Sequence, residues 1–382
     1  MKKNFFTSMG LMSGTSMDGV DVSIINSDGN AKFKGILNKY FEYSEDLHKK
    51  LTSSRDKINS STDLKIHSKE LDLLKKEITL FHCKAVNEVF KEIDFNVDII
   101  GFHGQTIFHN ADIKISKQLG DGNLLSQITK KIVINNFREE DLKNDGQGAP
   151  LTPIFHLLIS KILYKKKKIN FPLNIINIGG ITNVTKIMND SNSLENNVKA
   201  FDIAPGNCLI DEWIRRNSKN KFDKNGDIAK AGKVNNLILS QAIDNFEIST
   251  FEKSLDIKDF DIAFVKGLSL EDGCATLTKF SASLIARGIE YMSQINNCIS
   301  ETNLVCGGGR KNIFLLKSIE EILENKKTKL DNIDLLGLNG DFIESQAFGY
   351  LSVRTLLKLP ISFPSTTNCK SPTIGGTLNK NY

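Results

Sequence analysis

Apolar residues gather in short runs that end at glycine, and this pattern recurs along the chain. Phe5 and Phe6 lead into the glycine-rich run Gly10–Gly19, and largely alternating apolar residues follow from Val20 to Ile25. This is the pattern of a strand, a tight turn and a second strand. Other short apolar runs predict buried strands at 97–102, 132–134, 173–178, 184–187, 198–201 and 303–306.

Between these runs, apolar residues recur at the three- and four-residue spacing of amphipathic helices. Residues 63–90 and 275–295 each predict one long helix, and Thr152-Pro153 supplies an N-cap followed by proline at a first helical position. The strands come first in a mixed order and then alternate with helices, so the predicted fold class is α/β. A glycine turn follows a strand both at 10–19 and at 179–183, which predicts a duplicated fold.

Composition narrows the function classes. At 382 residues and 40% hydrophobic content, the chain is long enough for two domains. Its net charge of +5 is small, and the run Lys165–Lys168 has no interleaved aromatic or arginine residue, so we expect no nucleic-acid partner.

No apolar run reaches the ~20 residues that span a bilayer. The apolar stretch near the N-terminus is too short and too broken to be the hydrophobic region of a signal peptide. We therefore expect no membrane partner and a cytoplasmic location.

The six cysteines are scattered and form no Cys-x-x-Cys pair. Their spacing indicates neither a zinc site nor a disulfide framework, and it fits a reducing cytosol.

The first glycine turn carries candidate phosphate chemistry. Gly14 and Gly19 allow close backbone approach, and Thr15, Ser16 and Asp18 offer hydroxyls and a carboxylate where phosphate and metal would lie. The alternative is an ordinary β-hairpin turn.

Two later glycine turns extend this hypothesis. Asn177–Asn183 contains Gly179 and Gly180 between two predicted strands, and it predicts a second phosphate loop. Cys306–Asn312 places three consecutive glycines after a strand, where bare backbone could receive a flat ligand such as a purine. The alternatives are a plain glycine hairpin and a loose strand-to-helix loop.

Carboxylates near these turns are candidates for catalysis. Asp202 is predicted at the C-terminal end of a strand, before the turn at Pro205-Gly206, where carboxylates of α/β sheets point into the ligand crevice. It could instead only accept backbone N–H bonds at that turn. Glu344 is a second candidate, or merely part of a capped helix start.

Polar clusters after apolar runs could bind a sugar or its acidic substituent, since arginine suits bidentate carboxylate recognition. On spacing alone, a buried turn histidine and a surface ion pair are the simpler interpretations, and His103 and His109 have no nearby third ligand for a metal. The candidates are His103, Gln105, Arg138 and Asp141.

Taken together, these motifs closely resemble the anhydro-N-acetylmuramic acid kinase family over nearly the whole chain, in order. The matching stretches are Gly10–Val22, Gly101–Thr106, Leu119–Asn123, Asn136–His156, Asn177–Val184, Phe201–Trp213, Lys230–Val234, Val305–Asn312 and Gly340–Leu356.

This resemblance implies the two-lobed, ribonuclease H-like fold of sugar kinases, actin and Hsp70-type ATPases, with mixed sheets flanked by helices and ATP in the cleft. We place lobe I at 1–135 and lobe II at 136–357, and we expect the segment 358–382 to return to lobe I. The family also implies a homodimer.

The resemblance further implies an enzyme that opens the 1,6-anhydro ring of anhydro-N-acetylmuramic acid and phosphorylates it with ATP and Mg²⁺, in cell-wall recycling. Asp202 would be the base and Glu344 a supporting carboxylate, and Asp18 would contact Mg²⁺ through water. The nucleotide-binding residues would be Gly14, Thr15, Ser16, Met17, Asp18, Gly19, Val20, Asp21, Gly179, Gly180, Asn183, Gly307, Gly308, Gly309 and Asn312. The substrate-binding residues would be His103, Gln105, Arg138, Asp141, Gly206 and Asn207.

The chain departs from the family pattern in three places, one of which is the C-terminal run Ser371–Thr377, which is only loosely similar. Lys253–Phe260 lacks the glycine and arginine of the family's Lys-Ser-Thr-Gly-Arg-Glu run, and Ile203-Ala204 replaces a Thr-Gly pair. Two alternatives remain open: a kinase of the same fold that acts on an ordinary hydroxyl sugar, and a non-catalytic actin-like ATP switch.

Overall fold

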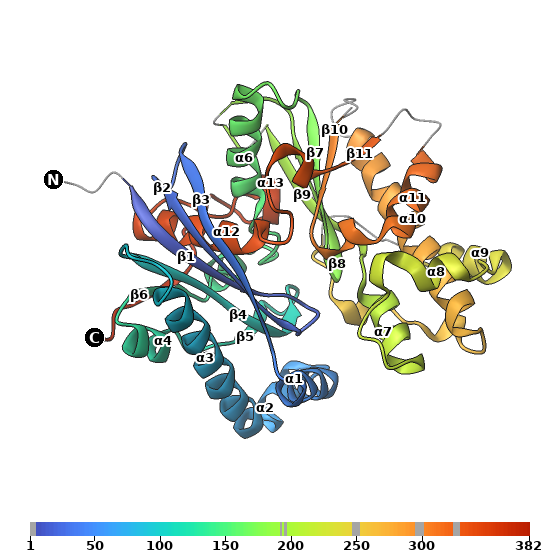
Figure 1. Ribbon diagram of the computed structural model, residues 1–382, viewed down its shortest axis with the longest axis horizontal. Coiled ribbons are helices and arrows are strands. Elements are labelled where there is room, and N and C mark those ends of the chain that lie inside the picture. The colour runs from blue at the N-terminus through green and yellow to red at the C-terminus, as the bar shows by residue number, and fades with distance from the viewer. Residues whose placement is uncertain (1–4, 192, 195–196, 247–252, 295–301, 324–328) are drawn as a thin grey trace. The chain divides into compact units, whose positions relative to one another are not determined.

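The chain forms two compact units. The computed structural model describes residues 5–191, 193–194, 197–246, 253–294, 302–323 and 329–382. Unit 1 comprises Met1–Ile159 and Phe342–Tyr382, and unit 2 comprises Ser160–Asp341. Figure 1 labels most of their helices and strands. Among the described helices, none is both long enough and apolar enough to cross a membrane.

Unit 1 is built on a seven-stranded sheet in the order β12-β6-β4-β1-β2-β3, with β5 paired to β4. Its strands are β1 (Phe6–Ser13), β2 (Gly19–Ser27), β3 (Phe33–Glu42), β4 (Ile99–Asn110), β5 (Ile115–Leu119), β6 (Ile132–Asn135) and β12 (Thr377–Asn379). Its helices are α1 (Glu45–Lys57), α2 (Ser61–Ile66), α3 (Ser68–Phe90), α4 (Gly122–Thr129), α5 (Glu139–Lys143), α12 (Ile343–Leu356) and α13 (Pro364–Thr367). Helix α6 (Pro153–Lys165) begins in unit 1 and ends in unit 2.

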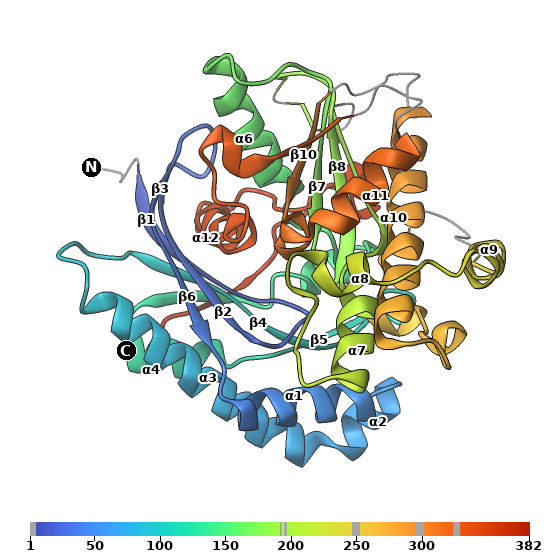
Figure 2. The same ribbon diagram turned by 45° about the vertical axis from the view of Figure 1, so that its right-hand side comes forward.

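Alternate residues of β1 serve the two faces of this sheet. Met9 and Leu11 point into a core shared with α1 and α3, whereas Ser8 and Gly10, which alternate with them along the strand, face α12. The Ser8 hydroxyl donates to the carbonyl of Gly349 on α12 at 2.8 Å. Helices α3 and α12 therefore cover opposite faces (Figure 2).

Unit 2 is built on a five-stranded sheet in the order β11-β10-β7-β8-β9. Its strands are β7 (Leu173–Ile178), β8 (Ile181–Ile187), β9 (Val198–Pro205), β10 (Thr302–Cys306) and β11 (Lys329–Asn332). Its helices are α7 (Cys208–Asn217), α8 (Asp227–Ala231), α9 (Asn236–Asp244), α10 (Leu270–Gln294) and α11 (Ile313–Leu323), with short 3-10 turns η1 (Lys224–Gly226), η2 (Ile257–Asp259), η3 (Ala263–Val265), η5 (Gly308–Lys311) and η7 (Ile333–Leu336). Its core packs one face of the sheet against α7, α10 and α11.

The two sheets repeat one topology. In each, three strands run antiparallel, β1-β2-β3 and β7-β8-β9. A fourth strand, β4 or β10, then pairs parallel to the first, and β6 or β11 pairs parallel to the fourth. This repeat confirms the predicted α/β class with duplicated mixed sheets flanked by helices.

The division between units differs from the boundary at 135/136 that the sequence suggested. Residues 136–159 and helix α12 belong to unit 1, because α12 packs against β1, β2 and β4. The segment 358–382 also lies in unit 1, where β12 pairs with β6.

Several elements differ from their predicted extents, and three of these differences matter most for the fold and the candidate site. Strand β4 continues to Asn110, because its second half pairs with β5, so His103 and Gln105 lie within a strand and not after one. Strand β9 continues to Pro205, which places Asp202 inside the strand and not at its end. The helix predicted over 63–90 is two helices, α2 and α3, which meet at His67.

Candidate active site

The first glycine turn, between β1 and β2, is held in shape by side chains from elsewhere in unit 1. The carbonyl of Gly14 accepts a hydrogen bond from Nε2 of Gln105 at 2.8 Å and from the Met17 amide at 3.2 Å. Met17 has a φ of +57°, and its carbonyl lies 2.8 Å from Nδ1 of His48. The turn is therefore braced by β4 and α1 before any ligand binds.

The polar side chains of this turn remain near its surface. Thr15 is exposed, and Ser16 and Asp18 are half-buried. The Ser16 hydroxyl donates to Oδ1 of Asp18 at 2.8 Å. At the start of β2, a Cβ on Gly19 would lie 2.6 Å from the Tyr40 ring, so that glycine is required by packing. The turn can thus present hydroxyls and one carboxylate to a phosphate chain.

Arg138 is held in place by the predicted substrate residue His103. Nδ1 of His103 donates to the Gly104 carbonyl at 2.8 Å, so its Nε2 is the acceptor for Nε and Nη2 of Arg138, at 3.3 and 3.1 Å. Burial, aided by the Arg138 charge, lowers the pKa of His103 to about 3, which keeps the ring neutral. Both ring nitrogens are engaged within the protein, and the arginine is the partly exposed member of the pair.

Asp141 is fully buried and ties together three segments of unit 1. Its carboxylate accepts from the Gly148 amide at 2.7 Å and from the Thr367 hydroxyl at 2.7 Å. A Cβ on Gly146 would lie 2.2 Å from the same carboxylate. These contacts give Asp141 a role in holding the 146–148 loop against α13.

Glu344, the second candidate carboxylate, lies in the first turn of α12 and is half-buried. A carboxylate in a first helical turn is favoured by the helix dipole.

In unit 2, the second glycine turn is bonded to the start of α7. The Gly179 carbonyl accepts from the Asn207 amide at 2.8 Å, and the Gly180 carbonyl accepts from the amides of Gly206 and Cys208 at 2.8 and 3.2 Å. A Cβ on Gly206 would lie 2.2 Å from the Gly179 carbonyl oxygen, so Gly206 is needed for this close approach. The two glycine motifs therefore form one structural group.

A row of polar side chains crosses four strands of the unit 2 sheet. Cys306 on β10 pairs with Asn177 on β7, Asn177 pairs with Asn183 on β8, and Asn183 pairs with Asp202 on β9. Residues directly opposite one another share a face of the sheet, so these side chains line up. Among the described residues, the buried Oδ1 of Asn183 has no hydrogen-bond partner.

Asp202 is the charged member of this row and is 7% exposed. Its Oδ2 accepts a hydrogen bond from the backbone amide of Leu255 at 2.9 Å. Cys208 begins α7, and burial, reinforced by Asp211, raises the pKa of its thiol to about 12, which disfavours the thiolate.

The three glycines that follow β10 differ in backbone conformation and in the atoms that surround them. Gly307 has a φ of +78°, and a Cβ on Gly309 would lie 2.2 Å from the Ile178 side chain. A Cβ on Gly308 would meet nothing within 4 Å in the described part of the chain. Asn312 closes the loop by accepting from the Leu315 amide at 2.9 Å, which caps α11. Backbone conformation and packing thus account for Gly307 and Gly309, whereas Gly308 is exposed.

Arg310, a residue that sequence reasoning assigned no role, locks this loop. Its Nε lies 3.0 Å from Oδ2 of Asp334, and its Nη1 lies 2.6 Å from Oδ1 of Asp341 and 3.0 Å from the Gly307 carbonyl. Its side chain is 3% exposed. The partners are 24 and 31 residues away along the chain, so no local motif signals the contact.

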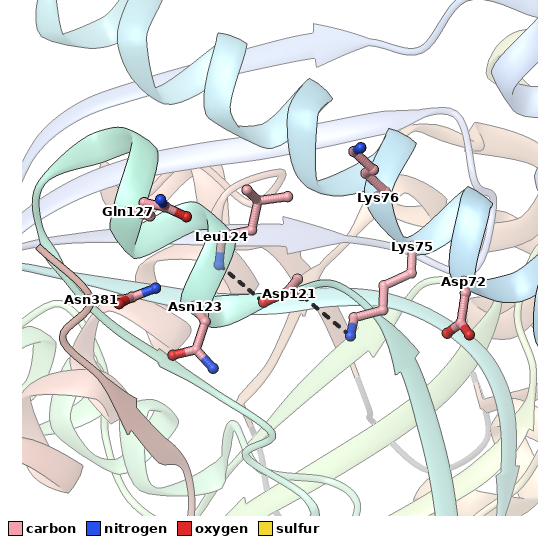
Figure 3. Close-up of a pocket in the computed structure, with 8 residues that line it drawn as sticks. All are labelled: Asp72, Lys75, Lys76, Asp121, Asn123, Leu124, Gln127 and Asn381. Carbon is pink, nitrogen blue, oxygen red and sulfur yellow. Dashed lines mark hydrogen bonds and ion pairs between the residues drawn. The ribbon is translucent and has the colours of Figure 1, made fainter.

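A polar hollow of about 460 Å³ on unit 1 contains none of the candidate residues (Figure 3). It lies between α3 and α4, where Asp121 Oδ1 accepts from the Leu124 amide at 3.0 Å and Oδ2 lies 3.4 Å from Lys75 Nζ. Asp121 therefore acts as the N-cap of α4.

Comparison with known proteins places this arrangement in a family. The family model described as anhydro-N-acetylmuramic acid kinase matches residues 6–381. A protein of that name from Pelagibacter ubique is 52% identical over 100% of both chains, and one from Zymomonas mobilis is 36% identical over 97% of this chain and 99% of its own.

Similar solved structures are much more distant. They include a ROK family glucokinase from Streptomyces griseus in complex with glucose and AMPPNP, at 9% identity and a TM-score of 0.42, covering 91% of this chain and 99% of that one. At that distance they do not bear on function. On the full-length match in sequence, the chain belongs to the anhydro-N-acetylmuramic acid kinase family.

Proposed function

We propose that the chain uses ATP and water to convert 1,6-anhydro-N-acetylmuramic acid into N-acetylmuramic acid 6-phosphate and ADP. The observation that carries this proposal is the family match over residues 6–381, together with 52% identity to a full-length relative of that name. The buried, hydrogen-bonded carboxylate of Asp202 supplies the chemical group that the reaction needs.

The substrate dictates the chemistry. In the anhydro sugar, O6 is bonded to the anomeric carbon, so there is no free 6-hydroxyl to deprotonate. A base must therefore take a proton from water while the water oxygen bonds to the anomeric carbon. The bond from that carbon to O6 breaks, and O6 takes the γ-phosphoryl group. This is the arrangement of an inverting glycosidase, with phosphoryl transfer replacing protonation of the leaving oxygen.

We assign the general base to Asp202. Its surroundings support the assignment, because the Leu255 amide holds one carboxylate oxygen and the polar row of β7 and β8 lies beside it. We assign Glu344 the role of a supporting carboxylate for the same water or sugar.

We assign ATP binding to the glycine turns. Residues 14–21 would contact the phosphates, Gly179, Gly180 and Asn183 would form the second phosphate loop, and Gly307–Asn312 would receive the purine. The open space over Gly308 is the cradle that a flat ring would occupy. The buried, unpartnered Oδ1 of Asn183 is a polar atom that a ligand or water could satisfy.

Asp18 is the residue we assign to Mg²⁺. Among the described residues there is no cluster of three or more His, Cys, Asp or Glu that could hold a metal ion. The assignment rests on the position of Asp18 in the first glycine turn, because Mg²⁺ is commonly held by one or two carboxylates, with substrate phosphates and water completing its ligands. When bound, the ion would offset phosphate charge and align the transfer.

We assign sugar binding to a group centred on Arg138. His103 and Gly148 hold its guanidinium, whose charge suits the acidic substituent of the sugar. In this assignment, Asp141 and Gln105 act mainly by shaping the loops around the ligands, and Gly206 and Asn207 would contact the sugar from the start of α7.

Replacement of the base tests the catalytic assignment. An Asp202→Asn variant should bind ATP and the anhydro sugar with near-parental affinity, yet lose ~10²–10⁴ in kcat, the typical contribution of one positioned base. Asp331→Asn, on the exposed edge strand β11, is the matched control and should keep full activity. Near-parental turnover by Asp202→Asn would remove Asp202 from the mechanism.

Isotope labelling tests the reaction class. In ¹⁸O-labelled water, early product analysed by mass spectrometry should carry the label at the anomeric oxygen. Product that forms without the label would point to a kinase of an ordinary hydroxyl sugar, and ATP hydrolysis that does not depend on sugar would point to an ATP switch.

We also propose a homodimer and a cytoplasmic location, in line with the family. Sedimentation equilibrium of the purified protein would give twice the chain mass for a dimer. A monomer at micromolar concentration would contradict it.

A further inference from the structure

The segment 253–260, where the chain departs from the family pattern, contacts the side chain assigned as the general base. The contact is made by backbone: the Leu255 N–H donates to Oδ2 of Asp202 at 2.9 Å. Both residues belong to unit 2. A donor supplied by the backbone does not depend on which side chain the segment carries at that position.

The residues that follow Leu255 turn back on themselves in a way that fixes its orientation. Asp256 caps the 3-10 turn η2, and its Oδ1 accepts from the Lys258 amide at 3.1 Å. In return, Oδ2 of Asp259 accepts from the Asp256 amide at 2.7 Å. This reciprocal capping box satisfies the amides of the turn locally. The Leu255 amide lies just outside it and is directed at β9.

The far end of the segment is anchored in the core. The ring of Phe260 stacks on Phe246 at a centroid distance of 5.5 Å, and Phe246 meets Phe280 of α10 edge-on at 5.8 Å. Aromatic contacts of this kind fix a loop to a helix. The segment thus links the long helix α10 to the strand that carries Asp202.

We propose that Leu255, through its backbone N–H, is a positioning residue for Asp202. The hydrogen bond engages Oδ2 of Asp202 with the segment and restrains the rotation of the carboxylate about its Cβ–Cγ bond. This inference rests on the proposed function, since it matters for turnover only if Asp202 is the base.

Proline substitution tests the contribution of this one N–H, because proline has none. Leu255→Pro should lower kcat by ~10- to 100-fold, the scale expected for a base displaced by about 1 Å, with KM for ATP and for the sugar within twofold of the parent. The separate variant Leu255→Ala keeps the N–H, so its kcat should stay within about threefold of that of the parent.

Ile257→Pro is the matched proline control in the same segment. Ile257 is the first residue of η2 and follows Asp256 at φ −115° and ψ 156°, an extended conformation that proline accepts in its predecessor. This variant should keep parental kcat. A Leu255→Pro variant that also keeps parental kcat would overturn the proposal, as would an equal loss in Leu255→Ala.

A second measurement covers the case in which Leu255→Pro fails to fold. An ester linkage that replaces the amide at Leu255 removes the N–H and keeps the leucine side chain, and it should produce the same fall in kcat. Unchanged turnover in the ester variant would overturn the proposal. The two hypotheses fail separately: an active Asp202→Asn variant refutes the assigned base, whereas an inactive Asp202→Asn variant beside a fully active ester variant refutes only the positioning role.

Discussion

Single glycines after β10 differ in what they do, although the sequence presents them as one run. Gly307 is required by its positive φ and Gly309 by the Ile178 side chain beneath it. Gly308 has neither reason among the described residues. A substitution at Gly308 can therefore test the proposed purine contact without disturbing the packing of the loop.

A valine at position 308 should therefore weaken ATP binding without destabilising the protein. We expect Gly308→Val to raise the Kd for ATP at least tenfold, because its side chain fills the space assigned to the purine, and to change Tm by less than about 2 °C. Calorimetric titration and thermal unfolding measure the two effects. Gly309→Ala is the contrasting variant and should lower Tm, because its Cβ would overlap Ile178. Unchanged ATP affinity in Gly308→Val would contradict the assignment.

Arg310 offers a second prediction at this scale. Burial of the Asp341 carboxyl by itself would raise its pKa, but Arg310 and Lys311 outweigh that effect and lower it. Arg310→Met should cost about 2–4 kcal/mol in free energy of unfolding, since it leaves Asp334 and Asp341 without their shared partner. Lys311→Met, which removes only an exposed partner of Asp341, should cost about 0–1 kcal/mol. Urea denaturation of the two variants checks the difference, and equal losses would contradict it.

At the scale of elements, α12 depends on glycines in the strands that it covers. A Cβ on Gly10 of β1 would lie 1.8 Å from the Ser345 carbonyl, and one on Gly101 of β4 would lie 2.2 Å from the Phe348 carbonyl. The obstructing atoms are helix backbone, which cannot rotate away as a side chain can. The helix therefore lies against strand backbone, and its first turn carries Glu344.

Gly101→Ala should consequently move α12 and destabilise unit 1. We expect a loss of about 1–3 kcal/mol or more, the usual cost of overpacking, together with reduced kcat because Glu344 moves with the helix. Gly35→Ala in the edge strand β3 is the control, since the nearest atom to its Cβ would be 3.7 Å away. Urea unfolding and steady-state kinetics check both effects. Equal stability of the two variants would show that the helix can shift without cost.

At the scale of the whole molecule, unit 1 contains four histidines whose pKa values are strongly lowered, three of them buried and His109 half-buried. Burial is the first cause for each, and it lowers the pKa of His82 to about 4 and those of His103, His109 and His156 to about 3. The unfolded chain binds protons at these groups near the ordinary value of 6.5, whereas the folded chain does not. Protons therefore favour the unfolded state in this range.

Stability should accordingly fall as the pH drops from about 6.5 toward 4. Thermal unfolding at intervals across this range should show Tm decreasing steadily, before most carboxylates titrate. His156→Gln removes one of the four groups and should make the decrease shallower, whatever its effect at pH 7. A parental Tm that stays constant between pH 6.5 and 4.5 would contradict the prediction.

The local motifs were readable because the conformation of a turn depends on its own residues. The strand at 173–178 and the proline start of α6 lie where the sequence predicted them, and both glycine turns lie within their predicted ranges, although they are shorter, at 14–18 and 179–180. The catalytic and binding roles carried over from the family remain proposals, since only ligands or variants can test them.

The chain by itself determined its fold class, its family and its glycine turns, because backbone freedom and apolar periodicity are properties of neighbouring residues. Tertiary structure alone decided that Asp202 lies inside β9 rather than at its end, that His103 supports Arg138, and that α12 belongs to unit 1. Each of these depends on pairing or packing between residues far apart along the chain, and no local pattern encodes such a contact.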